Sequence, residues 1–497
     1  MAKVTKKSLS ISETINELSD KSRFSAYSNP LITRYASKEM STIFSEQKRI
    51  GYFRRLWVAL AEGEQACGLN ITNAQIKELN EHLDDINFDV ALEREKEVRH
   101  DVMAHIYAYG KQCPQAAPII HLGATSCYVT DNADIIIYKE ALELTQYKLV
   151  AVIARLREFA LKFKKTPTLG FTHYQPAQPV TVGKRATLWI QELLIDYNNL
   201  VYSLDNLMLR GVKGATGTQA GFMTLFDSDS KKIHDLEDYV KNYFGFTKVF
   251  PVTGQTYTRK ADYSILTILS GIAQSAYKFS IDLRLLQSMK EVEEPFEKNQ
   301  VGSSAMAYKR NPMRSERISS IARYLMSLPI NAAMTAATQG FERTLDDSAN
   351  RRIVMGQAFL AVDAILELMM NVTDGLVVYE KVIERRLREE LPFIATEAIL
   401  MECVKAGGSR QHLHEKIREH SMACEKQYRD GGEKDLIARL KKDSDFDAIE
   451  DYDKILDPKN FIGRSDEQTI EFINQHIDPI LDKFKDKIQG LTGKIEV

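Results

Sequence analysis

Cysteine is scarce in this chain, and its spacing argues against small cross-linked proteins. There are five cysteines in 497 residues, an odd number with neither a C-x-x-C pair nor a zinc-type spacing. Sparse, unpaired cysteines are typical of a reducing compartment and argue against a disulfide scaffold. We therefore expect a cytoplasmic protein.

An excess of one charge sign is also missing. Lys and Arg total 66 against 68 for Asp and Glu, so no global field is available to hold a nucleic acid or an anionic membrane surface. No stretch reaches the uninterrupted apolar length of a membrane span. Residues 1–20 carry early lysines but lack the apolar segment of a signal peptide. We expect no nucleic-acid or membrane partner, and any anion must be recognised locally.

Motifs for common cofactors and metals are absent as well. The glycines in residues 211–217 follow a G-x-x-G-x-x-G spacing, which is neither the dinucleotide fingerprint nor a P-loop. The pairs His100/His105 and His412/His414 do not make the zinc-binding pattern of metalloproteases. The sequence therefore predicts no cofactor and no metal.

What the sequence has instead is a seven-residue repeat of apolar side chains in three long stretches. The repeated positions are Ile135, Leu142, Leu149, Leu156 and Phe163, then Ala186, Leu193, Leu200 and Leu207, then Ile265, Ile272, Phe279 and Leu286. Each stretch would form a helix roughly 40–50 Å long, and such stripes pack at shallow angles as bundles. Strand signals are weak and scattered, which disfavours a doubly wound α/β fold.

These observations predict an all-α protein with three helical domains. We place an N-terminal helical domain at 1–125, a central bundle of long helices at 126–378 and a C-terminal helical domain at 379–497. The apolar stripes exceed what one short-looped bundle usually buries, so we expect part of them to pack against other subunits.

Polar, glycine-bearing segments between the predicted helices are suited to carry function. In residues 302–312, GSSAMAYKRNP, a Gly-Ser-Ser turn precedes Lys309 and Asn311. A surface turn before a helix is the plain interpretation. Four cationic side chains lie within nine residues from Lys309 to Arg317, however, and this density indicates an anionic ligand.

Two histidines are candidates for proton transfer. His173 lies in GFTHYQPAQP, on a predicted loop before the second long helix, and polar neighbours such as Thr172 favour a titratable group over a structural one. His100, in the segment RHD, is a second candidate. Its alternative is a solvated helix surface on which Arg99 and Asp101 pair with their neighbours.

Taken together, these segments resemble the fumarase/aspartase superfamily, and specifically its adenylosuccinate lyase family. The matching stretches are RYAS at 34–37, RHDVMAH, HLGATSCYVTDN, GFTHYQPAQ, GQTYTRK, EEPFEKNQVGSSAM, KRNPMRSER and FERTLDDSANRR, with VIERRLREELPF and VKAGGSRQ extending the match toward the C-terminus. Ala307 departs from the pattern, because the superfamily usually has proline there. The resemblance implies an all-α homotetramer whose active sites are shared between subunits.

The resemblance also implies a reaction, the β-elimination of fumarate from a succinylated purine-pathway nucleotide. Ser303 would be the general base, with Ser304 as the fallback, and His173 the general acid. Glu316 would hydrogen-bond the other ring nitrogen of His173 and fix its tautomer. Lys309 and Asn311 would stabilise the aci-carboxylate dianion that forms when the proton is removed.

Substrate contacts are implied in the same way. Hydrogen bonds to the succinyl carboxylates are expected from Thr125, Ser126, Thr172 and Gln255. Contacts to phosphate and ribose are expected from Arg34, Tyr35, Arg317, Arg343, Ser348 and Arg352, because arginine binds phosphate in a bidentate manner. Residues expected to line the pocket near the nucleotide and the leaving group are Arg99, His100 and Asp101.

Two other functions are weighed against this one. The first is another lyase of the superfamily, such as argininosuccinate lyase, whose substrate carries no phosphate. The second is a catalytically silent helical oligomer that kept the fold. A scaffold has no physical need for the joint presence of His173, Ser303, Lys309, Asn311 and Glu316, which favours an enzyme.

Overall fold

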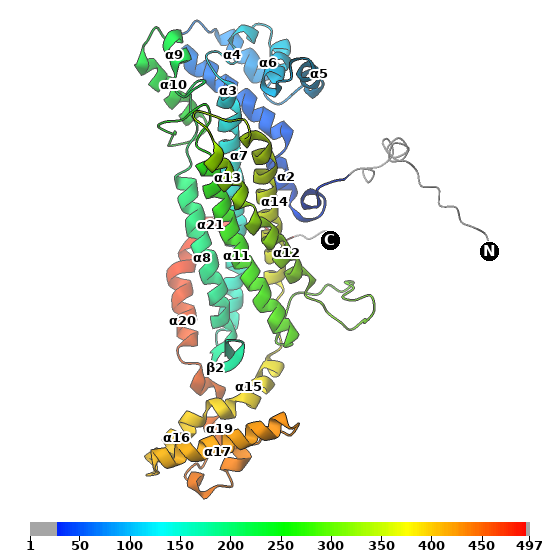
Figure 1. Cartoon of the computed structure of the whole chain (residues 1–497), viewed down its shortest axis with the longest axis vertical. Coiled ribbons are helices and arrows are strands. Elements are labelled where there is room, and N and C mark those ends of the chain that lie inside the picture. The colour runs from blue at the N-terminus through cyan, green and yellow to red at the C-terminus, as the bar shows by residue number, and fades with distance from the viewer. Residues whose placement is uncertain (1–26, 494–497) are drawn as a thin grey trace, which may run out of the picture.

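A computed structural model describes residues 27–493, and helices make up most of it (Figure 1). The predicted all-α class is confirmed. Residues 1–20, for which no signal peptide is predicted, lie outside the described part. The N-terminal elements are η1 (Leu31–Tyr35), α2 (Lys38–Ile43), α3 (Glu46–Ala66), α4 (Asn73–Glu81), α5 (Phe88–Val98), α6 (Asp101–Gln112) and η2 (Ala117–Ile119).

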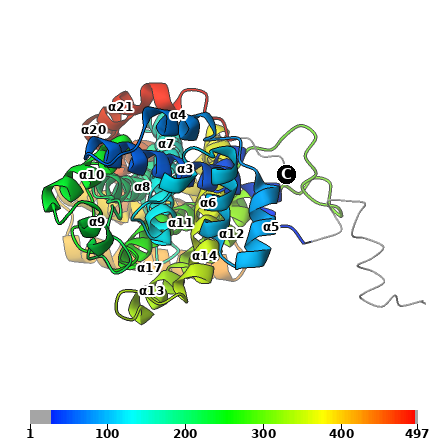
Figure 2. The same ribbon diagram turned by 90° about the horizontal axis from the view of Figure 1, so that it is seen from above.

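Long helices form the central bundle, as the seven-residue repeats predict. They are α7 (Ser126–Lys162), α8 (Val182–Asp205), α11 (Lys260–Ser288), α12 (Met313–Ser327), α13 (Pro329–Thr338) and α14 (Asp347–Asp374). Viewed along the long axis, they lie side by side (Figure 2). Repeated residues such as Leu149, Leu193 and Ile272 are buried in one continuous core. The three predicted long helices are therefore confirmed as α7, α8 and α11.

The helix α14 is both long and apolar. It is the one helix within residues 27–493 that is long and apolar enough to cross a membrane, and 78% of its most apolar window is buried inside the fold. It packs against α7, α11 and α12. A buried core helix can have the same length and apolar composition, and α14 lies buried in the core of the bundle.

A second core joins the N-terminal helices to a later part of the chain. The short helices α9 (Ala220–Leu225) and α10 (Ser230–Tyr243) lie beside α3, at the end of the bundle where α7 begins (Figure 1). Residues such as Trp57, Tyr109, Phe222 and Leu236 are buried together there. This end of the molecule thus collects segments far apart in sequence around the start of α7.

The segment around His173 is a β-hairpin rather than the predicted loop. Strand β1 (Pro167–Thr172) pairs antiparallel with β2 (Gln175–Thr181), and Thr172 lies opposite Gln175. His173 and Tyr174 form the two-residue turn, and both have positive φ, 53° and 57°. That geometry suits the twist of a hairpin. The strands escape prediction because β1 contains a proline and a glycine and β2 contains two prolines.

The C-terminal elements form a third core, and the last helices return to the bundle. The elements are α15 (Glu380–Ile394), α16 (Thr396–Lys405), α17 (Arg410–Arg429), α18 (Leu436–Leu440), η3 (Ser444–Phe446), α19 (Tyr452–Ile455), η4 (Pro458–Phe461), α20 (Ser465–Phe472), η5 (Ile473–Ile477) and α21 (Asp478–Ile488). Apolar residues between 395 and 461 make up the third core. The helices α20 and α21 contact α8 and α7. The boundaries near 125 and 378 stay a prediction.

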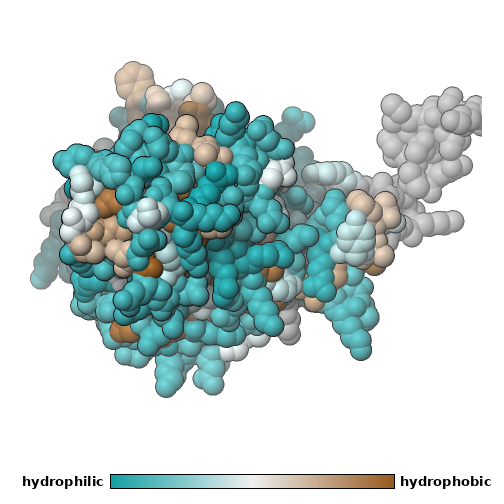
Figure 3. Space-filling model, turned by 90° about the horizontal axis from the view of Figure 1, so that it is seen from below, coloured by the Kyte–Doolittle hydropathy of each residue, from teal (hydrophilic) through white to brown (hydrophobic). Residues whose placement is uncertain are grey.

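Apolar side chains on the outer face of the bundle remain exposed. Leu188, Ile195 and Tyr202 repeat every seven residues along α8 and are 47%, 54% and 71% exposed. By contrast, the end of the molecule formed by the C-terminal helices is mostly hydrophilic, with smaller apolar areas (Figure 3). The unburied stripe therefore belongs to the flank of the bundle.

Candidate active site

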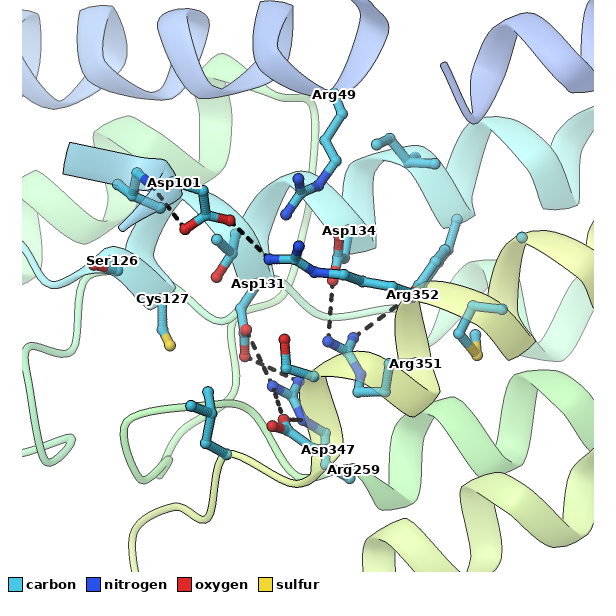
Figure 4. Close-up of a pocket in the computed structure, with 18 of the residues that line it drawn as sticks. Arg49, Asp101, Ser126, Cys127, Asp131, Asp134, Arg259, Asp347, Arg351 and Arg352 are labelled. Carbon is cyan, nitrogen blue, oxygen red and sulfur yellow. Dashed lines mark hydrogen bonds and ion pairs between the residues drawn. The ribbon is translucent and has the colours of Figure 1, made fainter. Parts of the chain in front are cut away.

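Three helices begin around one pocket at the end of the bundle that carries the N-terminal helices (Figure 4). His100 is the N-cap of α6, Thr125 the N-cap of α7, and Asp347 the first residue of α14. We call this the helix-start pocket; its volume is about 260 Å³. Helix N-termini present free N–H groups and a partial positive charge, so this pocket favours anions.

Buried ion pairs form the floor of the helix-start pocket. Arg259 contacts Asp131 at 3.1 Å and Asp347 at 2.7 Å, and Arg351 contacts Asp134 at 3.1 Å (Figure 4). Burial would raise the pKa of Asp131, but the charges of Arg259 and Arg351 outweigh it, so the pKa is lowered from its usual value. These arginines neutralise their own carboxylates, which leaves ligand binding to residues at the pocket mouth.

Arg343 is a cation of this pocket with donor capacity left over. Its guanidinium donates to Gln255 Oε1 at 2.9 Å and to Cys127 Sγ at 3.0 Å. Its buried Nε has no hydrogen-bond partner among residues 27–493. Gln255 in turn donates to Thr125 Oγ1 at 3.5 Å. Three of the predicted ligands are thus brought together, and an anion could bind the Arg343 guanidinium.

His100 and Asp101 lie on the opposite wall of this pocket. His100 Nδ1 accepts the backbone N–H of Met103 at 3.3 Å, so the neutral ring carries its proton on Nε2. Nε2 lies 3.4 Å from Ser126 Oγ. Asp101 accepts a hydrogen bond from Arg352 at 2.7 Å, which links α6 to α14. The predicted residues of the RHD segment therefore reach the predicted α7 and α14 ligands, except Arg99, which is exposed at the end of α5.

A second pocket of about 490 Å³ holds another set of predicted residues. The guanidinium groups of Arg34 and Arg317 both lie near the Tyr35 ring. Their Cζ atoms are 6.0 Å and 5.5 Å from its centroid. Lys148 also lines the pocket and is bound by Asp363 and by Glu367. We call this the η1 pocket. It brings together two of the four arginines predicted to contact phosphate and ribose, Arg34 and Arg317, whereas Arg343 and Arg352 line the helix-start pocket.

The Gly-Ser-Ser segment is part of a loop that projects from the bundle before α12 (Figure 1). A buried amide closes its neck. Gln287, near the end of α11, accepts the backbone N–H of Glu294 at 3.2 Å and donates to the carbonyl of Arg310 at 3.1 Å. The Glu294 carboxylate accepts the N–H groups of Arg314 and Ser315 at the start of α12. Both arms of the loop are therefore anchored to helices.

Inside this loop, Ser303 is surrounded by hydrogen-bond donors. Its Oγ accepts the N–H of Ala305 at 3.3 Å and that of Met306 at 3.1 Å. Two such donors favour negative charge on an oxygen. Asn311 donates to the carbonyl of Gly302 at 2.8 Å. The Lys309 side chain is exposed and makes no hydrogen bond or ion pair with another described residue.

The predicted acid and its partner are not in contact within one chain. His173 is exposed at the hairpin turn, and Glu316 is exposed in the first turn of α12. Neither side chain forms a hydrogen bond or ion pair within residues 27–493. The expected bond from Glu316 to the His173 ring is therefore absent from the single subunit, because the two elements present these side chains to solvent.

The long helices keep the predicted groups apart. The helix-start pocket lies at the beginning of α7, whereas the hairpin follows its end, and 37 residues of helix span roughly 55 Å. The helix α11 begins at the pocket and ends at the loop neck after 29 residues, about 44 Å of helix. One chain thus carries three separate sets of predicted residues.

Several pocket residues escaped the sequence analysis. Arg259, Asp131, Asp134, Asp347 and Arg351 line the helix-start pocket beside predicted ligands. All lie within or next to motifs that were recognised, such as GQTYTRK and DDSANRR. Charged residues that interrupt an apolar helix, as Asp131 and Asp134 do in α7, were the available signal for a buried ion-pair network.

Comparison with known proteins agrees with these features. The model of a family described as "Lyase" matches residues 35–326, and that of "Adenylosuccinate lyase C-terminus" matches residues 392–472. The chain is 52% identical to an adenylosuccinate lyase of Schizosaccharomyces pombe, covering 94% of this chain and 98% of that protein. It is 50% identical to the Saccharomyces cerevisiae adenylosuccinate lyase, covering 95% and 99%.

Solved structures of more distant proteins share the fold. A 3-carboxy-cis,cis-muconate lactonizing enzyme from Pseudomonas putida superposes with a TM-score of 0.77 at 21% identity, covering 90% of this chain and 99% of that one. A fumarate lyase from Mesorhizobium gives a TM-score of 0.75 at 20% identity, covering 90% and 100%. From its full-length sequence matches, its two family models and its fold, the chain belongs to the adenylosuccinate lyase family of carbon–nitrogen lyases.

Proposed function

We propose that this enzyme cleaves adenylosuccinate to AMP and fumarate, with Ser303 as the general base and His173 as the general acid. The Ser303 oxygen takes the proton from the succinyl carbon next to a carboxylate. The electron pair left behind forms the carbon–carbon double bond of fumarate as the carbon–nitrogen bond breaks, and His173 delivers a proton to the departing amine. The catalytic cycle closes when Ser303 loses the proton that it took and His173 regains the proton that it gave.

The Ser303 loop carries the groups that this proton removal needs. An alcohol is a poor base unless its alkoxide is stabilised, and the Oγ already accepts two backbone N–H groups. Lys309 would supply a positive charge beside the aci-carboxylate dianion, and Asn311 a hydrogen bond once it leaves Gly302. Ser304 is the fallback base, and Glu316 would orient His173.

Binding of the substrate is assigned to the two pockets. The succinyl carboxylates would contact Thr125, Ser126 and Gln255 at the start of α7, together with Thr172. The phosphate and ribose would contact Arg34, Tyr35, Arg317, Arg343, Ser348 and Arg352. Arg99, His100 and Asp101 would lie near the leaving group. The unpaired Nε of Arg343 supports the anion contact.

The observation that carries the shared-site proposal is the separation of these groups within one chain. About 55 Å of α7 lies between the helix-start pocket and the hairpin, too far for one small substrate to bridge. A complete site therefore needs segments of neighbouring copies. The exposed line Leu188, Ile195 and Tyr202 on α8 offers an apolar surface on which copies can pack.

We further propose a homotetramer located in the cytoplasm. In such an assembly, long helices from several subunits would form one central bundle, and each site would combine the hairpin, the loop and the helix-start pocket of different chains. The same chemistry would also cleave succinylaminoimidazole-carboxamide ribotide, because the succinyl group is identical and the broken bond again joins it to nitrogen, with a carboxamide nitrogen as the leaving group.

A fumarate-release assay on the purified chain tests the reaction. Adenylosuccinate should yield AMP and fumarate in equal amounts, followed by absorbance and by chromatography of the nucleotide. Turnover of argininosuccinate in its place would assign the chain to a different lyase. Absence of turnover with every succinyl compound, in a protein verified as folded and assembled, would favour the silent scaffold.

A further inference from the structure

The C-terminal tail, residues 490–493, is anchored to the bundle beside the η1 pocket. Arg155 of α7 donates to the carbonyl of Leu491. Asn371 of α14 donates to the carbonyl of Gly493 at 2.9 Å. The Leu491 side chain packs against the bundle core. Two helices and an apolar contact therefore hold this short segment, which follows the end of α21, in one place.

The fit of the tail on α14 depends on a glycine. A Cβ atom at Gly493 would overlap the backbone nitrogen of Asn371 and the carbonyl oxygen of Glu367. It would also overlap the Cβ atom of Met370. Backbone atoms of a helix cannot move aside cheaply. Any larger residue at position 493 must lift the tail from α14. A substitution at this position therefore tests whether the docked tail contributes to function.

The docked tail forms part of the wall of the η1 pocket. Gly490, Leu491 and Thr492 line it together with Arg34 and Arg317. The pocket volume of about 490 Å³ lies in the range of small-ligand sites. The tail thus narrows the space in which the two guanidinium groups and the Tyr35 ring meet a ligand.

We propose that residues 490–493 are a positioning segment of the nucleotide site, which holds the pocket around the substrate phosphate in its binding shape. The inference rests on the proposed role of Arg34 and Arg317 as phosphate contacts. A wall of ordered backbone limits the geometries that these cations can adopt, and this preorganisation strengthens their attraction to an anion. The tail touches none of the proposed proton-transfer groups, so its contribution should fall on binding rather than on chemistry.

The test compares three chains with the intact enzyme. One is full length with Gly493→Ala, one ends at Gln489, and one ends at Gly493 as the control that keeps the docked residues. Steady-state kinetics are measured with adenylosuccinate and with its phosphate-free nucleoside, and inorganic phosphate is used as a competing anion. Thermal unfolding and size-exclusion chromatography show which chains are folded and assembled.

The expected result is selective for the phosphate. KM for adenylosuccinate should rise about tenfold in Gly493→Ala and in the chain ending at Gln489, a change that corresponds to one modest contact, while kcat stays within about twofold. KM for the nucleoside should not change, and inhibition by phosphate should weaken. The chain ending at Gly493 should behave as the intact enzyme.

Other outcomes overturn the inference in distinct ways. Unchanged KM in Gly493→Ala and in the chain ending at Gln489 would remove the tail from the site. An equal rise in KM for nucleotide and nucleoside would make it a general structural element. A raised KM for adenylosuccinate in the chain ending at Gly493 would show that residues after 493, rather than the docked tail, determine binding. Arg34→Met separates the two proposals, because the phosphate assignment itself fails if this variant binds adenylosuccinate normally.

Discussion

At the residue scale, the chain separates the proposed reacting groups from the buried charges. The side chains of His173 and Lys309 are exposed and have no partner within residues 27–493, whereas Arg259 and Arg351 are buried and engaged with carboxylates. Buried pairs of this kind are costly to break, because the remaining charge is left without compensation. Single substitutions should therefore divide into those that affect catalysis and those that affect folding.

The two proposed proton-transfer residues belong to the first group. We expect His173→Ala and Ser303→Ala each to lower kcat by at least roughly a hundredfold, the usual worth of general acid–base catalysis. Because both side chains are exposed or half-buried, the melting temperature should stay unchanged. Steady-state kinetics and thermal unfolding measure the two effects. Activity retained in either variant would remove that residue from the mechanism.

Glu64 belongs to the second group. It is fully buried, neither carboxylate oxygen has a hydrogen-bond partner within residues 27–493, and burial raises its pKa to about 9. The folded state then holds a proton that the unfolded state releases near its ordinary pKa of 4.5. The protonated Glu64 carboxyl therefore contributes fully to the free energy of unfolding below the pKa of the unfolded chain. That contribution is lost as the pH rises toward the pKa of Glu64 in the folded protein.

Glu64→Gln removes that titration while keeping the shape of the side chain. We expect the variant to melt higher than the wild type at pH 8 and the difference to shrink toward pH 5.5, with a gain on the order of 3 kcal/mol near neutral pH. Thermal unfolding across this pH range measures it. A difference that does not depend on pH would show that Glu64 is not protonated in the folded protein.

At the element scale, the long helices could be predicted from the sequence, but the contacts between separate elements could not. Repeats such as Leu142, Leu149 and Leu156 predict α7 because one face of a long helix must be buried. The two strands that flank His173 were missed because both contain prolines. The neck of the loop depends on contacts between Gln287 and residues on both arms, which no local pattern reveals.

Within that neck, the Gln287 amide is the side chain that bonds the backbone of both arms of the Ser303 loop. We expect Gln287→Ala to lower kcat roughly tenfold, because the freed arms displace a base that must lie within hydrogen-bond reach of its proton. Cleavage within the loop by a protease should become faster. Ser288→Ala is the matched control, since the Ser288 hydroxyl bonds only within its own helix. Equal behaviour of the two variants would contradict the role of the neck.

At the scale of the whole molecule, the proposed site residues were predicted from their motifs, yet the single chain does not unite them. The helix-start pocket gathers His100, Ser126, Arg343 and Arg352 from distant segments, as the resemblance implies. The hairpin and the loop lie far along the same helices. An assembly cannot be read from one sequence, because the contacts between copies that would complete the proposed site leave no local pattern in it.

The exposed stripe on α8 should be needed for that assembly. We expect Ile195→Lys to shift the enzyme toward smaller species and to lower activity in proportion, because a charge would be buried in an apolar interface. Light scattering after size-exclusion chromatography measures the mass. Met422→Lys is the control, an apolar residue 62% exposed on the C-terminal helices. An intact assembly in Ile195→Lys would place the interface elsewhere.

The most direct test of shared active sites mixes two inactive variants. His173→Ala and Ser303→Ala are unfolded together, refolded and compared with each variant treated alone, and native mass spectrometry verifies that mixed assemblies form. If the two residues of one site come from different subunits, about a quarter of the sites regain both in a random equal mixture, and fumarate release should recover to that extent. Activity that stays at the level of the parent variants in verified mixed assemblies would contradict the account.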